Sequence, residues 1–184
     1  MGLRSTCTSV AGVELVELEM HGDHRGHVTE LFCDEWASMA GFVPRQWHML
    51  ACLPGALRGM HAHARHDDLK IVTAGSVTLA LKDLRQGSPT EGMGDLMRLS
   101  EEQYAAVRIP AGVAHGVVAD THALVLVGVT IPYDGTDELQ CAWDDPALGI
   151  DWPVAPTLVS ERDRTAGTVA ELLDALAPWQ PLYR

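Results

Sequence analysis

The chain has 184 residues, of which 47% are hydrophobic and 21% charged, a balance typical of one globular domain with a substantial core. Its formal net charge of −12 at pH 7 argues against a protein that binds nucleic acid or an anionic membrane, because both functions depend on an excess of Lys and Arg. A small anionic ligand remains compatible with this charge, since it needs only a few local cations.

The N-terminal residues MGLRSTCTSVAG lack the apolar run of a signal peptide, and no later run approaches the ~20 residues of a transmembrane helix. We therefore expect a cytoplasmic protein. The cysteines, Cys7, Cys33, Cys52 and Cys141, are scattered and form no CxxC pair. This spacing predicts buried free thiols, with neither a zinc ribbon nor a disulfide framework.

Further along the chain, apolar residues alternate with polar ones or form short blocks between Gly, Pro and Asp. This pattern predicts strands over 12–20, 27–32, 47–53, 69–75, 76–84, 105–110, 112–119 and 123–131. A helix is predicted over 168–179, where Val169, Leu172, Leu173 and Leu176 share one face, and a shorter one over 33–41. Many short strands and a C-terminal helix predict an all-β jelly-roll sandwich or barrel. No linker divides residues 1–184, so we expect a single domain.

The stretch GALRGMHAHARHDDLKIVTAG (55–75) and the later Pro110, Gly112 and His115 resemble the two motifs of the cupin superfamily. In metal-binding cupins the matching positions, here His61, His63, Asp68 and His115, converge on one metal ion. His61 and His63 lie two residues apart on a strand, so their side chains project from the same face, as a shared ion requires. Imidazole and carboxylate together would suit Zn, Fe, Mn, Ni or Cu.

A second resemblance covers most of residues 22–163 and is carried by seven blocks in order. They are GDHRGHVTELF (22–32), PRQWHM (44–49), GALRGMH (55–61), KDLRQGSPTEG (82–92), IPAGVAHGV (109–117), DELQCAWDDPALGIDWP (137–153) and VSERD (159–163). Together they resemble the dTDP-4-dehydrorhamnose 3,5-epimerase family, which is itself a jelly-roll cupin. The resemblance implies an isomerase of a nucleotide-linked 4-keto-6-deoxyhexose in deoxysugar biosynthesis that works without a metal or other cofactor.

The same resemblance assigns the proton-transfer residues. The carbonyl at carbon 4 of such a sugar acidifies the hydrogens at carbons 3 and 5, so a base can remove one, and reprotonation from the opposite face inverts the centre. The family's base corresponds to His61 and the aspartate that holds it to Asp163. We therefore expect His61 to lie within hydrogen-bond reach of Asp163. Asp68 should then point away, or toward Lys70 or Arg65 at the surface.

The family's substrate-binding positions also have counterparts in this chain. By resemblance, Tyr133 stacks on the thymine ring, and Arg25 and Arg58 offer bidentate donors to the diphosphate. The remaining binding positions correspond to Glu30, Gln46, His115, Glu138 and Arg162, the last in place of a lysine. A homodimer formed through strands near the N-terminus is also implied by the resemblance.

The chain departs from the family pattern near the sugar. The family's proton-donating tyrosine corresponds to Val127, and valine carries no exchangeable proton. The family's lysine near the carbonyl corresponds to Asp68, although Lys70 on the same strand face is a possible substitute. His48 stands in place of an asparagine, and His63 in place of a residue such as glutamine. The identity of the second proton carrier is therefore open between His63, His48 and water. We count His63 with the catalytic residues and His48 with the substrate-binding positions.

Three other functions are compatible with these residues. Sugar 3,4-ketoisomerases carry a similar RGxHAH stretch, here RGMHAH (58–63), and their two histidines move protons on one face of the sugar. A metallocupin would use His61, His63, Asp68 and His115 on a divalent ion. A sugar-nucleotide binder without activity would keep the binding residues alone. The other histidines, His21, His24, His27, His66 and His122, receive no role.

Overall fold

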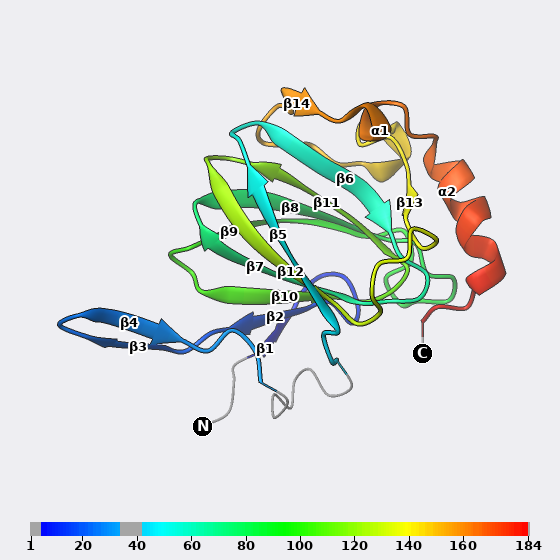
Figure 1. Ribbon diagram of the computed structural model, residues 1–184. Coiled ribbons are helices and arrows are strands. Elements are labelled where there is room, and N and C mark those ends of the chain that lie inside the picture. Colours follow the sequence, from blue (N-terminus) through cyan, green and yellow to red (C-terminus); the bar gives the residue numbers. More distant parts are fainter. Residues whose placement is uncertain (1–4, 34–41, 184) are drawn as a thin grey trace.

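The computed structural model describes residues 5–33 and 42–183, and it shows two β-sheets packed face to face (Figure 1). The predicted helix over 33–41 lies almost wholly outside the described residues. The first sheet has the order β1-β2-β10-β7-β12-β5, with neighbouring strands antiparallel. Its strands are β1 (Ser5–Cys7), β2 (Glu14–Glu17), β10 (Ala105–Ile109), β7 (Asp68–Ala74), β12 (Ala123–Val129) and β5 (Gln46–Cys52).

The second sheet has the order β13-β6-β11-β8-β9, and β14 adds to β6 in parallel. Its strands are β13 (Leu139–Gln140), β6 (Ala56–Ala62), β11 (Val113–Ala119), β8 (Ser76–Asp83), β9 (Gly94–Ser100) and β14 (Leu158–Val159). Both sheets combine strands from distant parts of the chain, which confirms the predicted jelly-roll class. The strand prediction missed β9, because the apolar residues of GDLMRLS are adjacent and do not alternate.

The core lies between the sheets and follows from the two-residue period of the strands. Val77, Leu79 and Leu81 of β8 point into it, while Ala80 of the same strand points to the outer side of the sheet. Both faces of β8 and β11 are therefore covered, and this explains why their sequences are almost continuously apolar.

Helix α2 (Val169–Leu176) covers the outer face of the second sheet. It begins with a capping box, in which Thr168 accepts from the backbone N–H of Glu171 and Glu171 accepts from that of Thr168. Val169, Leu172 and Leu176 are buried, but Leu173 is exposed, so its predicted place on the buried face is wrong. The last predicted turn is a 3₁₀ turn, Ala177–Trp179, because Pro178 has no N–H to continue the α-helix.

The predicted strand over 12–20 is also wrong in its extent, since the chain divides there into β2 and β3. Strands β3 (Met20–Asp23) and β4 (Gly26–Thr29) form a separate hairpin that extends from the sandwich (Figure 1). Two short helical segments, Pro146–Leu148 and α1 (Glu161–Arg164), lie in the C-terminal part of the chain. Among the described residues, no helix has the length and apolar character needed to cross a membrane.

Candidate active site

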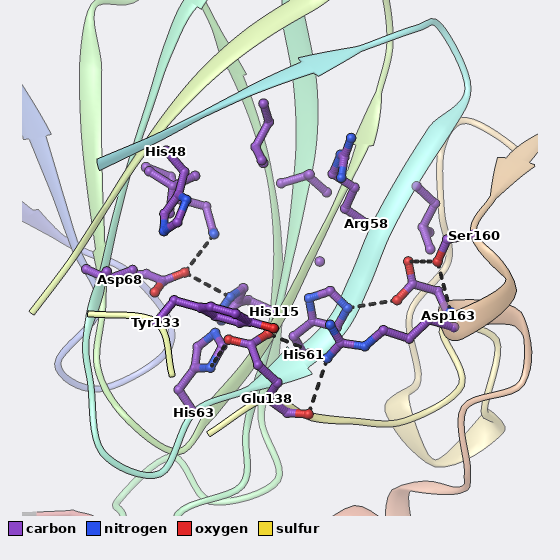
Figure 2. A pocket seen from close by; sticks show the side chains of 18 of the residues that line it. His48, Arg58, His61, His63, Asp68, His115, Tyr133, Glu138, Ser160 and Asp163 are labelled. Carbon is purple, nitrogen blue, oxygen red and sulfur yellow. Dashed lines mark hydrogen bonds and ion pairs between the residues drawn. The ribbon is translucent and has the colours of Figure 1, made fainter. Parts of the chain in front are cut away.

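A cavity of about 870 Å³ lies between the two sheets, within the size range of small-molecule sites. Strands β5, β7 and β12 supply one wall, β6 and β11 the other, and the segment from β14 to α1 supplies its rim. Figure 2 shows the side chains that line it. Of the sequence-predicted residues, those that line it are His48, Arg58, His61, His63, Asp68, Lys70, His115, Val127, Tyr133, Glu138, Arg162 and Asp163.

A bulge in β6 brings two of these side chains to the same wall. Arg58 and His61 lie three positions apart, whereas their partners on β11, Val117 and His115, lie two positions apart, so β6 holds one extra residue there. Gly59 occupies the bulge at φ +137°, and a Cβ on it would lie 2.4 Å from Cα of Gly116. Only glycine fits this conformation. The RG pair of RGMH therefore lets both Arg58 and His61 face the cavity.

The predicted pair of His61 and Asp163 is confirmed as a contact. His61 Nε2 lies 2.8 Å from Oδ1 of Asp163, across the gap between β6 and α1 (Figure 2). Ser160 donates to the other carboxylate oxygen at 2.9 Å. Burial alone would raise the pKa of Asp163, but its bonds to His61 and Ser160 hold it below the usual value. The carboxylate thus accepts the proton of Nε2, and the lone pair of His61 lies on Nδ1.

Asp68 lies inside the protein, and the prediction of a surface position for it is wrong. Its exposed fraction is 3%, because it points inward from β7. The predicted contact with Lys70 is confirmed, with Lys70 Nζ 2.8 Å from Oδ2. Arg65 pairs with Asp134 instead. His115 Nε2 lies 3.2 Å from the same Oδ2.

These contacts determine the charges in the cavity. Burial alone would raise the pKa of Asp68, but Lys70 and His115 lower it well below its usual value. Burial and the Lys70 ammonium lower the pKa of His115 to about 4. At neutral pH the cavity therefore holds a carboxylate, an ammonium group and a neutral imidazole within one hydrogen-bonded cluster.

Two further residues beside this cluster were not predicted, His66 and Asp137. The rings of His63 and His66 stack with centroids 4.0 Å apart. Asp137 contacts both rings, with its backbone oxygen 2.7 Å from Nδ1 of His63 and its Oδ2 3.0 Å from Nδ1 of His66. The only sequence signal for His66 is its place in HARHDD, between the predicted site residues His63 and Asp68. The signal for Asp137 is that it directly precedes Glu138, a predicted substrate-binding residue.

The two stacked rings differ in charge. Burial alone would lower the pKa of His66, but its contacts with Asp137 and Asp68 raise it to about 9. Burial lowers the pKa of His63, and the neighbouring charge of His66 lowers it further. His66 is therefore protonated near neutral pH and His63 is neutral. Because the Asp137 oxygen can only accept, His63 keeps its single proton on Nδ1.

Val127 stands in a row of three residues that runs across the first sheet. It pairs with His48 on β5 and with Lys70 on β7, so these side chains point to the same face and into the cavity. Val127, for which the resemblance predicts the position of the family's proton-donating tyrosine, is thus flanked directly by His48 and Lys70.

The predicted nucleotide-binding residues divide into two groups. Arg58, Tyr133, Glu138 and Arg162 line the cavity. Gln46 does not line it, and instead accepts a hydrogen bond of 2.7 Å from the backbone N–H of Tyr133. Gln46 therefore holds the aromatic residue in place.

The second group consists of Arg25 and Glu30, which do not line this cavity. Arg25 lies between β3 and β4 and pairs with Asp23 at 2.6 Å, and Glu30 directly follows β4. The hairpin extends away from the sandwich (Figure 1), so a single chain does not bring these two residues to the cavity. Their role in substrate binding stays a prediction.

Comparisons with known proteins agree with this architecture. The family model described as dTDP-4-dehydrorhamnose 3,5-epimerase matches residues 7–171. A relative of that name from Sinorhizobium fredii is 35% identical over 175 residues, covering 89% of this chain and 88% of the relative.

Two solved structures are also similar. NovW, a 4-keto-6-deoxy sugar epimerase from Streptomyces spheroides, has a TM-score of 0.88 and 29% identity, covering 100% of this chain and 94% of its own. RmlC from Legionella pneumophila, solved with dTDP-4-keto-L-rhamnose, has a TM-score of 0.86 and 29% identity, covering 99% of each chain. The chain belongs to the dTDP-4-dehydrorhamnose 3,5-epimerase family.

Proposed function

We propose that the protein is an epimerase of a nucleotide-linked 4-keto-6-deoxyhexose in deoxysugar biosynthesis, with thymidine diphosphate as the nucleotide. The observation that carries this proposal is the 2.8 Å contact between His61 and Asp163 in the wall of the cavity. Membership of the family supports the substrate class, since the Legionella pneumophila relative was solved with a dTDP-linked 4-keto sugar.

In this reaction His61 acts as the base. Nδ1 takes a proton from the carbon next to the carbonyl, and the electron pair of the broken C–H bond moves into an enolate whose charge lies on the carbonyl oxygen. The Asp163 carboxylate stabilises the imidazolium that forms. Lys70 supplies a buried positive charge for the enolate oxygen. The acidity comes from the substrate's own carbonyl, so the step needs no cofactor.

We assign the second proton carrier to His48. His61 rises from β6 and His48 from β5, which belong to the two opposite sheets, so a sugar between them has one imidazole on each face. His63 is less suited to this role, because its single proton is held on Nδ1 by the Asp137 backbone oxygen. His48 also pairs with Val127, which by the resemblance to the family stands at the position of the proton-donating tyrosine.

The test is an incubation of the dTDP-4-keto-6-deoxyglucose substrate with the enzyme in heavy water. Wild-type protein should incorporate deuterium at carbon 3 and invert that centre, and His61→Asn should do neither. His48→Gln should still incorporate deuterium, because His61 exchanges its proton with solvent, but should lose inversion by ~10²-fold or more. Exposed His122→Asn is the matched control. Undiminished exchange by folded His61→Asn protein would refute His61 as the base.

A 3,4-ketoisomerase is the second candidate, because His61 and His63 both line the cavity. It would move the carbonyl to carbon 3, whereas an epimerase leaves it at carbon 4. The ¹³C spectrum of the product distinguishes the two reactions directly.

We also propose that two copies form a homodimer. Arg25 and Glu30 do not line the cavity of their own chain, so in a dimer the hairpin of one chain is free to reach the other copy. The outward face of β5 supports this proposal, because it exposes Trp47 and Met49 at the edge of a sheet. Cys52 and Cys141 are buried free thiols, which supports a cytoplasmic location.

A further inference from the structure

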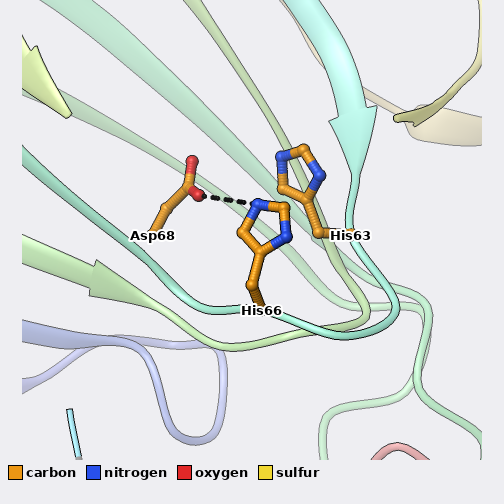
Figure 3. A group of neighbouring side chains, drawn as sticks. All are labelled: His63, His66 and Asp68. Atoms are coloured by element: carbon orange, nitrogen blue, oxygen red, sulfur yellow. Dashed lines mark ion pairs between the residues drawn. The ribbon is translucent and has the colours of Figure 1, made fainter. Parts of the chain in front are cut away.

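Three buried side chains at one end of the cavity have potential ligand atoms close together. One such atom from each of His63, His66 and Asp68 lies within 4.8 Å of the other two (Figure 3). All three residues also line the cavity, so a small ion has a path to them. His61 is not part of this group; its Nε2 contacts Asp163 instead.

Both histidines are oriented as metal ligands usually are. A ligating imidazole commonly donates its second N–H to a carbonyl or carboxylate, which fixes the ring and directs the other nitrogen to the metal. Here the Nδ1 atoms of His63 and His66 contact the backbone oxygen and the carboxylate of Asp137, respectively. One residue thus holds both rings with Nδ1 engaged, and Nε2 of each ring is the atom left for an ion.

Asp68 supplies an oxygen that has only a long contact. Its side chain is only 3% exposed, and Lys70 occupies Oδ2. Oδ1 is buried and accepts no close hydrogen bond from any described residue; it forms an ion pair with Nε2 of His66 at 3.5 Å. A metal ion that takes the place of the His66 proton would lie between these two atoms and bind both.

We propose that His63, His66 and Asp68 bind one divalent transition-metal ion, such as Zn²⁺ or Co²⁺, through two imidazole nitrogens and one carboxylate oxygen. The ligand set differs from that of the cupin motif, because it includes His66 and leaves out both His61 and His115. The ion replaces a proton on His66 and leaves coordination positions open toward the cavity, where an oxygen of a bound molecule can reach it. The proposal does not rest on the proposed epimerase activity, since none of its observations involves the base His61.

The test is a Co²⁺ titration of protein that carries no histidine tag and has been dialysed against chelator. Wild-type protein should take up one equivalent with the visible absorption of low-coordinate Co²⁺. His63→Gln and His66→Gln should each lower the affinity by ~100-fold, whereas exposed His122→Gln should leave it unchanged. Lys70→Met should tighten binding about tenfold, because it removes a positive charge beside the ion.

X-ray absorption of the wild-type protein with one equivalent of Zn²⁺ gives a result that does not depend on the folding of any variant. It should show two imidazoles and a carboxylate in the coordination sphere. The proposal is overturned if wild-type protein binds no Co²⁺, if its Zn²⁺ spectrum lacks imidazole ligands, or if folded His66→Gln protein binds as tightly as wild type.

Discussion

Asp163→Asn should reverse the proton arrangement of His61. The backbone N–H of Asp163 donates to Oγ of Ser160 at 3.0 Å, so the Ser160 hydroxyl must direct its own proton to Oδ2 of Asp163 at 2.9 Å. In the Asp163→Asn variant this hydroxyl would hold the amide oxygen, and the amide NH₂ would then face His61. Nε2 of His61 would have to accept a hydrogen bond from this NH₂ group. The single proton of the imidazole would then move to Nδ1, the nitrogen that should act as the base.

The expected loss of rate follows from two changes, the lost hydrogen bond to a charged group and the proton on the wrong nitrogen of His61. A hydrogen bond to a charged group is worth ~1.5–3 kcal/mol, which corresponds to a rate change of about ten- to 150-fold. A proton on the wrong nitrogen also removes general base catalysis, which contributes about 10²–10⁴-fold. We therefore expect Asp163→Asn to slow deuterium exchange by at least about 10²-fold without unfolding the protein.

A second substitution tests the tautomer argument. Ser160→Ala removes the hydroxyl that holds the amide, so the asparagine can rotate and offer its oxygen to Nε2. The double variant should therefore regain about tenfold or more of the exchange rate, although Ser160→Ala alone removes a bond to the carboxylate. The assay is proton NMR of the substrate in heavy water, with circular dichroism as the folding control. An Asp163→Asn rate within threefold of wild type, or a double variant slower than Asp163→Asn, would refute the reasoning.

Three other predictions concern binding, assembly and stability. Arg58→Ala should weaken TDP binding in calorimetry by about ten- to 150-fold, because a charged hydrogen-bond donor at the cavity is lost. The control Arg98→Ala on β9 should leave TDP binding unchanged. If wild-type protein binds no TDP, the nucleotide assignment is contradicted. Met49→Lys, which places a charge on the exposed face of β5, should shift the dimer toward monomer in sedimentation velocity, whereas exposed Met93→Lys should not; a wild-type protein that is monomeric at all concentrations would exclude the dimer. Asp83→Asn should lower the free energy of unfolding at pH 7 by about 2 kcal/mol. Burial alone would raise the pKa of Asp83, but hydrogen bonds from Arg85, Ser88 and Thr90 lower it to about 2, so the folded state stabilises the carboxylate. This contribution is present above the usual pKa near 4 and is lost as the pH falls toward 2, so urea midpoints of the two proteins should converge in acid; a constant difference would contradict it.

The sequence alone determined the fold class, and its resemblance to the family predicted the contact between His61 and Asp163. Alternation of apolar residues predicts β2, β5, β7, β10 and β12 of the first sheet, because each strand must present one side to the core, but only β8 and β11 of the second. The family blocks around GALRGMH and VSERD identified His61 and Asp163, although 102 positions separate them, and the structure places them in contact. This pair came from the resemblance to the family, because residue types alone do not show which histidine contacts which carboxylate.

Only the tertiary structure decided which other polar residues share the site. His66 and Asp137 are 71 positions apart, and no periodicity in the sequence brings them together. The row of His48, Val127 and Lys70 exists because β5 and β7 both pair with β12 in one register, and a local pattern does not specify the register between distant strands. The same limit applies to Arg25, because its side chain type suits a diphosphate, but the direction of the hairpin decides what it can reach.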